Sequence, residues 1–148
     1  MAELNSVASQ ELFEEQTKHL KGPLLVARGW TAFSSAFPVL DIGFTSQGRL
    51  PIRFQLNCED WHEKPPSVAL LSWEGERLRS VPTGPTSVFN SSSHPVTGFP
   101  FVCMPGSKEY HSHPSHLNDH WENYKTRSGY DLGGIVHQIW LAWMKSRP

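Results

Sequence analysis

The stretch that follows Asp131 constrains the fold most strongly. Apolar residues recur there in alternating steps of three and four, from Leu132 to Met144, which is the spacing of one buried helix face. Asp131 directly precedes the pattern and is suited to cap the N-terminus of the helix. Because so continuous an apolar face needs a partner surface, the sequence predicts that this C-terminal helix covers a sheet.

Four earlier apolar segments predict the strands of that sheet. They are residues 24–30, 37–45, 50–56 and 67–73, rich in Val, Ile, Leu, Phe and Trp and separated by short polar, Gly or Pro breaks. In the third segment Ile52 and Phe54 alternate with Arg53 and Gln55, which predicts one apolar and one polar face. The break at 46–49 has the composition of a hairpin turn. We therefore expect a four-stranded antiparallel meander.

Three further segments complete the expected fold. Residues 5–21 carry apolar side chains such as Val7 and Leu20 at helical spacing and end at Gly22-Pro23, which predicts an N-terminal helix. Residues 74–108, dense in Pro, Gly and Ser, predict a long irregular segment that we call the active-site wrap. A short helix is expected after His113, with Leu117, Trp121 and Tyr124 on one face.

Composition limits the class of protein. The chain has 148 residues, 38% of them hydrophobic, and a formal net charge of −1, which fits one α+β domain over residues 1–148 and argues against a nucleic-acid partner. Residues 1–22 lack the basic start and apolar run of a signal peptide, and no apolar run reaches the roughly 18 residues of a membrane span. The sequence predicts a soluble, cytoplasmic protein that does not bind membranes.

Cys103 is the foremost candidate for chemistry. Only two cysteines, Cys58 and Cys103, occur in the chain, too few for a disulfide framework. Cys103 lies between an apolar extended segment and the turn residues Pro105-Gly106, where a thiol can be exposed on a rigid backbone. Cys58, in contrast, closes the third predicted strand and is expected to be structural.

Imidazoles surround Cys103 in the sequence. His94, His111, His113 and His116 all lie within thirteen residues of it, and an imidazole can lower the pKa of a thiol or accept its proton. The alternative for Cys103 is that of a small buried hydrophobic residue between Val102 and Met104.

The order of these parts resembles that of a ubiquitin-conjugating enzyme. An N-terminal helix, a meander, the Pro65-Pro66 pair before the last strand, the His94-Pro95-Val96 turn, Cys103 and a covering helix follow one another as in that family. Its divergent bacterial members, found with ubiquitin-like, activating and deubiquitinase-like proteins, are the most similar.

The resemblance implies a function and its partners. Cys103 would receive a ubiquitin-like protein from an activating enzyme as a thioester and pass it to an amine of a protein acceptor, without a cofactor. His94 would order the loop before the cysteine. His111, His113 or an asparagine would help deprotonate the amine or hold the oxyanion.

The chain departs from the family pattern at two places. Val96 stands where the family has an asparagine, so another residue must support the oxyanion; Asn90, His111 and Asn118 are candidates by residue type. The segment between Cys103 and Trp121 is also longer than is usual and rich in histidine.

That histidine-rich segment gives the alternative hypothesis of a zinc-binding module without transfer activity. Thiolate, carboxylate and imidazole groups are zinc ligands, and Cys103, Glu109, His111 and His116 would be the set. This set also resembles that of a bacterial metal-binding family named for a Cys, a Glu and two His. A zinc-bound Cys103 would be a poor thioester acceptor. A third hypothesis is an inactive scaffold that only binds the activating enzyme or the ubiquitin-like protein.

Overall fold

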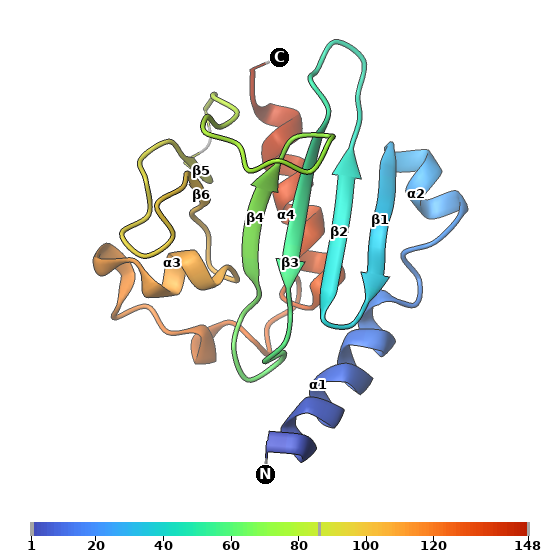
Figure 1. The fold of residues 1–148 in the computed structure, drawn as a ribbon, viewed down its shortest axis with the longest axis vertical. Coiled ribbons are helices and arrows are strands. Elements are labelled where there is room, and N and C mark those ends of the chain that lie inside the picture. Colours follow the sequence, from blue (N-terminus) through green and yellow to red (C-terminus); the bar gives the residue numbers. More distant parts are fainter. Residues whose placement is uncertain (1, 86, 148) are drawn as a thin grey trace.

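The protein has an α+β fold built on one four-stranded antiparallel sheet. The computed structural model describes residues 2–85 and 87–147. The strands β1 (Trp30–Ala36), β2 (Val39–Phe44), β3 (Ile52–Asn57) and β4 (Ser67–Leu71) lie side by side in chain order (Figure 1). The predicted four-stranded meander is therefore confirmed.

Helix α4 (Leu132–Lys145) lies against one face of the sheet, as Figure 1 shows. It buries Leu132, Ile135, Val136, Ile139, Ala142 and Trp143. These side chains share one core with those of the strands, where the Trp143 and Phe44 ring centroids are 5.6 Å apart. The Asp131 carboxylate accepts a hydrogen bond from the Gly134 N–H at 2.8 Å. The covering helix and its N-cap are confirmed, although Met144 at the end of the pattern is exposed.

Helix α2 (Pro23–Arg28) occupies the segment in which we expected the first strand. Pro23 fits the first helical turn because the N–H groups of that turn form no hydrogen bond within the helix, so the lack of an N–H on proline costs nothing. Gly29 ends the helix in the left-handed conformation, with φ +70°, and a Cβ at this position would lie 2.5 Å from the Thr45 carbonyl oxygen. The strand prediction for residues 24–30 is thus wrong. Most β1 residues are exposed, so no apolar pattern marked the true strand.

Helix α1 (Ala2–Thr17) confirms the predicted N-terminal helix, which ends at Thr17 rather than at residue 21. Its buried face carries Ser9, Phe13 and Thr17 at four-residue steps. Val7, which we expected on the apolar face, is 54% exposed. The Gln16 side-chain oxygen accepts a hydrogen bond from the Leu132 N–H at 2.9 Å, which ties α1 to the start of α4.

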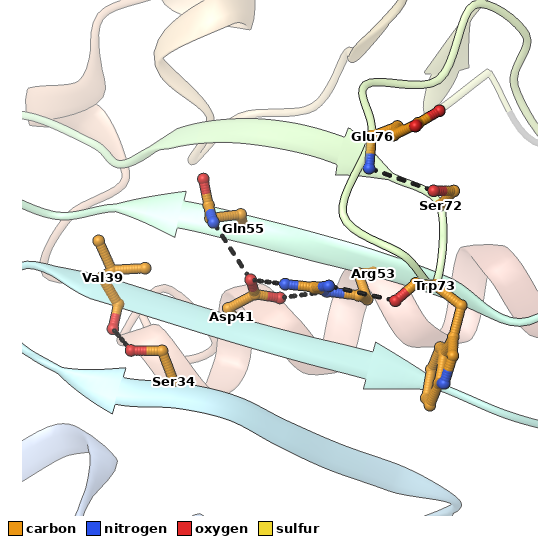
Figure 2. A network of polar contacts seen from close by, with 8 residues as sticks. All are labelled: Ser34, Val39, Asp41, Arg53, Gln55, Ser72, Trp73 and Glu76. Carbon is orange, nitrogen blue, oxygen red and sulfur yellow. Dashed lines mark hydrogen bonds and ion pairs between the residues drawn. The ribbon is translucent and has the colours of Figure 1, made fainter.

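The second face of the sheet carries an ion pair between the buried Asp41 and the partly buried Arg53 (Figure 2). The Asp41 carboxylate accepts hydrogen bonds from Arg53 Nη2 at 2.6 Å, Arg53 Nε at 3.2 Å and Gln55 Nε2 at 3.1 Å. Phe33 lies over the Arg53 guanidinium, with 4.0 Å between Cζ and the ring centroid. The Trp73 ring folds back against Phe33 and the backbone of Gly43. This face is polar at Arg53 and Gln55, as predicted, but Phe33 and Trp73 partly cover it.

The wrap is ordered against the sheet. It contains two short strands, β5 (Phe89–Asn90) and β6 (Phe101–Val102), that pair antiparallel. In Figure 1 both lie beside β4. Phe89 and Val102 belong to the hydrophobic core and hold the wrap to it, whereas the buried Phe101 packs against His94 and His113.

Three short helices follow the wrap instead of the single short helix that we expected. They are α3 (Lys108–Ser112) and the 3₁₀ turns η1 (Pro114–His116) and η2 (Trp121–Asn123). His113 and His120 both have extended backbone, which interrupts any longer helix. Trp121 is buried, as predicted, whereas Leu117 is 56% exposed. Among the described residues, none of the helices combines the length and the apolar character that a membrane span requires.

Candidate functional site

Cys103 lies directly after β6 on a backbone that is fixed by hydrogen bonding. Its N–H donates to the Val88 carbonyl oxygen at 2.5 Å, and its side chain is half-buried. Burial raises the pKa of the Cys103 thiol, while a hydrogen bond from the Asn90 side chain opposes this shift. The resting thiol is therefore protonated near neutral pH, and a nearby proton acceptor would assist its attack.

His116 is the histidine that contacts this thiol. Its Nε2 lies 3.7 Å from Cys103 Sγ, which is hydrogen-bond distance for a sulfur atom. Its ring stacks on Tyr110, with 4.1 Å between the centroids and 15° between the planes. In the sequence His116 is one of four imidazoles near Cys103 and a member of the zinc set, but nothing there singles it out as the base. Its position next to the thiol depends on η1, which turns the chain back toward β6 and which the sequence pattern does not reveal.

His94 orders the loop before the cysteine, as expected. It is 1% exposed, its Nε2 lies 2.9 Å from the Glu109 carbonyl oxygen, and its Nδ1 accepts from the Val96 N–H at 3.1 Å. Nε2–H is thus the donor and Nδ1 the acceptor. Because both ring nitrogens are engaged, His94 links the His94–Gly98 turn to α3 and has no free lone pair for proton transfer.

His111 and His113 do not reach the thiol. His111 Nε2 accepts from the Gly106 N–H at 3.1 Å, and its Nδ1 lies 2.7 Å from the Asp119 carbonyl oxygen, to which it donates. Burial lowers the pKa of His111, which favours the neutral ring with a hydrogen bond at each nitrogen. The Nδ1 of His113 accepts from the Ser115 N–H at 3.1 Å and caps η1. Both rings hold backbone in place.

Glu109 points away from Cys103, toward the edge of the sheet. Its side chain is 4% exposed; Oε1 accepts from the Val68 N–H at 2.8 Å and Oε2 from the Ser67 hydroxyl at 2.5 Å. β4 is the last strand of the sheet, so the carboxylate occupies the place of a fifth strand's carbonyl groups. Glu109 anchors α3 to β4.

These contacts bear on the zinc hypothesis. Of the four expected ligands, Cys103 and His116 come together, whereas Glu109 and His111 use their lone pairs on β4 and on Gly106. Within residues 2–85 and 87–147, no three His, Cys, Asp or Glu side chains are arranged to hold a metal ion. This conformation does not fit a four-ligand zinc site, and zinc binding stays a prediction for metal analysis to test.

The two asparagines named as candidates to support the oxyanion, Asn90 and Asn118, lie in different surroundings. The Asn90 side chain lies near enough to the Cys103 thiol to oppose the rise in its pKa, and its Oδ1 accepts from the Ser92 N–H at 2.9 Å. Asn118 is exposed, and Val96 is 80% exposed on the His94–Gly98 turn. Asn90 is therefore the amide beside the nucleophile. Its position follows from the β5–β6 pairing, which the sequence analysis did not include.

A large cavity of the structure lies apart from Cys103. A cavity of about 570 Å³ lies between the 49–52 turn, residues 72–83 and the end of α4, and Cys103 does not line it. Cys58 is 1% exposed, and burial raises the pKa of its thiol to about 12, so it is structural as expected.

No family model matches the chain, and no curated protein matches it.

Proposed function

We propose that the protein is a ubiquitin-like-protein conjugating enzyme that carries its cargo as a thioester on Cys103. The observation that carries this proposal is the contact of the half-exposed Cys103 thiol with His116 Nε2 at 3.7 Å. The order of the parts adds support, since an N-terminal helix, a four-strand meander, the Pro65-Pro66 pair before β4 and the His94 turn precede this cysteine and a covering helix follows it. We propose a UBC-like fold on the same grounds.

In the first step the thiol of Cys103 attacks the thioester between the activating enzyme and the ubiquitin-like protein. The Cys103 S–C bond forms while the bond from that carbonyl to the activating enzyme's sulfur breaks. His116 takes the thiol proton and returns it to the departing thiolate, so atoms and charge balance. A base is needed because burial keeps the thiol protonated.

In the second step an acceptor amine attacks the Cys103 thioester: the C–N bond forms, the C–S bond to Cys103 breaks, and a proton of the amine passes by way of His116 to the departing thiolate. The Asn90 side-chain amide, which opposes the rise in the pKa of the Cys103 thiol, would donate to the oxyanion that develops on the adjacent carbon. It would serve where Val96 replaces the family asparagine. His94 keeps the role of ordering the turn.

The test is a charging assay. The protein is incubated with ATP and with an activating enzyme and a ubiquitin-like protein from the same organism, and adducts are separated with and without a reducing thiol. We expect a thiol-sensitive adduct that Cys103→Ala abolishes. Cys58→Ala is the matched control, because Cys58 is buried away from solvent, and it should keep the adduct.

Two results would decide against conjugation. Stoichiometric zinc in the purified protein, lost in Cys103→Ala and accompanied by no adduct, would favour the metal-binding module. Normal complex formation with the activating enzyme by both wild type and Cys103→Ala, without an adduct from either, would favour an inactive scaffold.

A further inference from the structure

The orientation of His116 depends on one aromatic ring. Within the described residues, its Nε2 contacts Cys103 Sγ, and no hydrogen bond is made to its Nδ1. In many thiol and hydroxyl nucleophile sites a third group bonds the far side of the imidazole and orients it. Here the closest neighbour of the ring is Tyr110, stacked at 4.1 Å and 15°. His113, the next ring, is 5.9 Å away and tilted by 46°.

Tyr110 itself is held at both ends. Its backbone N–H donates to the Ser107 hydroxyl at 3.1 Å, the N-cap bond of α3. Its phenol donates to Asp119 Oδ2 at 2.5 Å. The Tyr110 ring therefore has a fixed height and tilt under His116.

Asp119 is fixed in turn. Its Oδ2 also accepts from the Tyr124 hydroxyl at 2.7 Å, and its carbonyl oxygen accepts from His111 Nδ1. The hydrogen bonds from Tyr110 and Tyr124 hold the pKa of the Asp119 carboxyl below its ordinary value, and positive charge on His111 and His116 would add to this effect. Burial and the bond to Asp119 raise the pKa of Tyr110, and the bond to Asp119 raises the pKa of Tyr124, so both phenols stay protonated as donors.

We propose that Tyr110, braced by Asp119, is a positioning residue that holds His116 at the Cys103 thiol. The stack takes the place of a hydrogen bond to Nδ1, and the Asp119 carboxylate holds the Tyr110 ring against His116 through its bond to the phenol. This role rests on the proposed function only in that both use His116 as the base for Cys103.

Three titratable groups lie next to His116: Cys103, which follows β6, Tyr110 on α3, and His113, which precedes η1. Asp119 and His111 lie further away, beyond Tyr110. A change in the pH dependence of Cys103 reactivity can therefore be traced to a small set of side chains.

The experiment measures alkylation of Cys103 by iodoacetamide, followed by mass spectrometry of the Cys103 peptide from pH 6 to 10. In this reaction the S–C bond forms, iodide leaves and His116 takes the proton, so no conjugation partner is required. His116→Ala should slow alkylation near pH 7.5 by about tenfold or more, and the loss should shrink as the thiol ionises directly at high pH.

Tyr110→Leu should reproduce most of that loss and the same change in pH profile, because a displaced base transfers protons poorly. Tyr110→Phe keeps a ring for the stack but loses the hydrogen bond to Asp119, so its rate should lie between those of Tyr110→Leu and wild type. Phe33→Leu is the control, since Phe33 is a partly exposed ring that lies over Arg53 on the other face of the sheet, and it should keep the wild-type profile.

A Tyr110→Leu protein that is folded by circular dichroism and alkylates at the wild-type rate and profile would overturn the proposal. If Tyr110→Leu does not fold, the decision passes to Asp119→Asn, which leaves the rings in place; an unchanged profile there overturns the proposal and a reduced rate near pH 7.5 supports it. If the wild type forms the thioester adduct but Tyr110→Leu alkylates as the wild type does, only the role of Tyr110 is refuted. If the alkylation pattern is as expected but no thioester adduct forms, only the conjugation function is refuted.

Discussion

Glu109 offers a test that separates an anchoring role from metal binding. Glu109→Ala removes the acceptors for the buried Val68 N–H and the Ser67 hydroxyl. A buried donor left without a partner costs roughly 1–3 kcal/mol, and a lost charge-assisted bond is of similar size. We expect the free energy of unfolding to fall by about 2–4 kcal/mol.

Glu109→Gln is the matched variant. Its amide oxygen can still accept from the Val68 N–H, and its NH₂ group can donate to the Ser67 oxygen once that hydroxyl rotates. The loss should therefore be about 1 kcal/mol. Urea unfolding followed by the fluorescence of the six tryptophans measures both variants.

The anchoring argument is refuted if Glu109→Ala loses less than about 0.5 kcal/mol, the usual scatter for surface changes. It is refuted as well if both variants unfold normally but release bound zinc, since the carboxylate would then act on a metal rather than on β4.

Two further predictions concern stability away from the site. Asp41→Ala leaves the Arg53 guanidinium without its partner on the sheet face and should cost about 3 kcal/mol, whereas the double change Asp41→Leu with Arg53→Met should cost less than Asp41→Ala alone; urea midpoints of the three proteins test this order. The Cys58 thiol, with its pKa raised to about 12 in the fold, stays protonated while the unfolded thiol ionises near pH 9. Stability from this group is therefore complete below pH 9 and declines by about 1.4 kcal/mol per pH unit between 9 and 12; the decline should be weaker in Cys58→Ala than in wild type when unfolding is measured across that range.

The elements with strong periodicity could be predicted from the sequence. The steps in Leu132–Lys145 and the alternation around Phe54 reflect burial on one side only, so α4 and β3 were found. The strand prediction for residues 24–30 failed because their apolar composition suits a helix as well as a strand. The Pro at the start and the Gly at the end of α2 were the signals that favoured a helix.

The candidate site was predictable in its nucleophile but not in its imidazole. Cys103 stands out by its rarity and its turn residues. The histidines share residue type and region, and their roles differ only through the atoms that they meet: backbone groups for His94, His111 and His113, and sulfur for His116. Such contacts depend on η1 and on the β5–β6 pairing, neither of which leaves a periodic pattern.

The anchor of Glu109 on β4 also bears on self-association. A strand at the end of a sheet has backbone groups that can pair with another chain. The Glu109 carboxylate and the Lys108 N–H, which donates to the Pro66 carbonyl oxygen at 2.8 Å, occupy that part of β4. Release of α3 would leave Pro66 and Val68 able to pair with the same strand of a second molecule. Helix α3, which leads into the turn that carries His116, therefore also blocks edge-to-edge pairing of β4 with a second molecule.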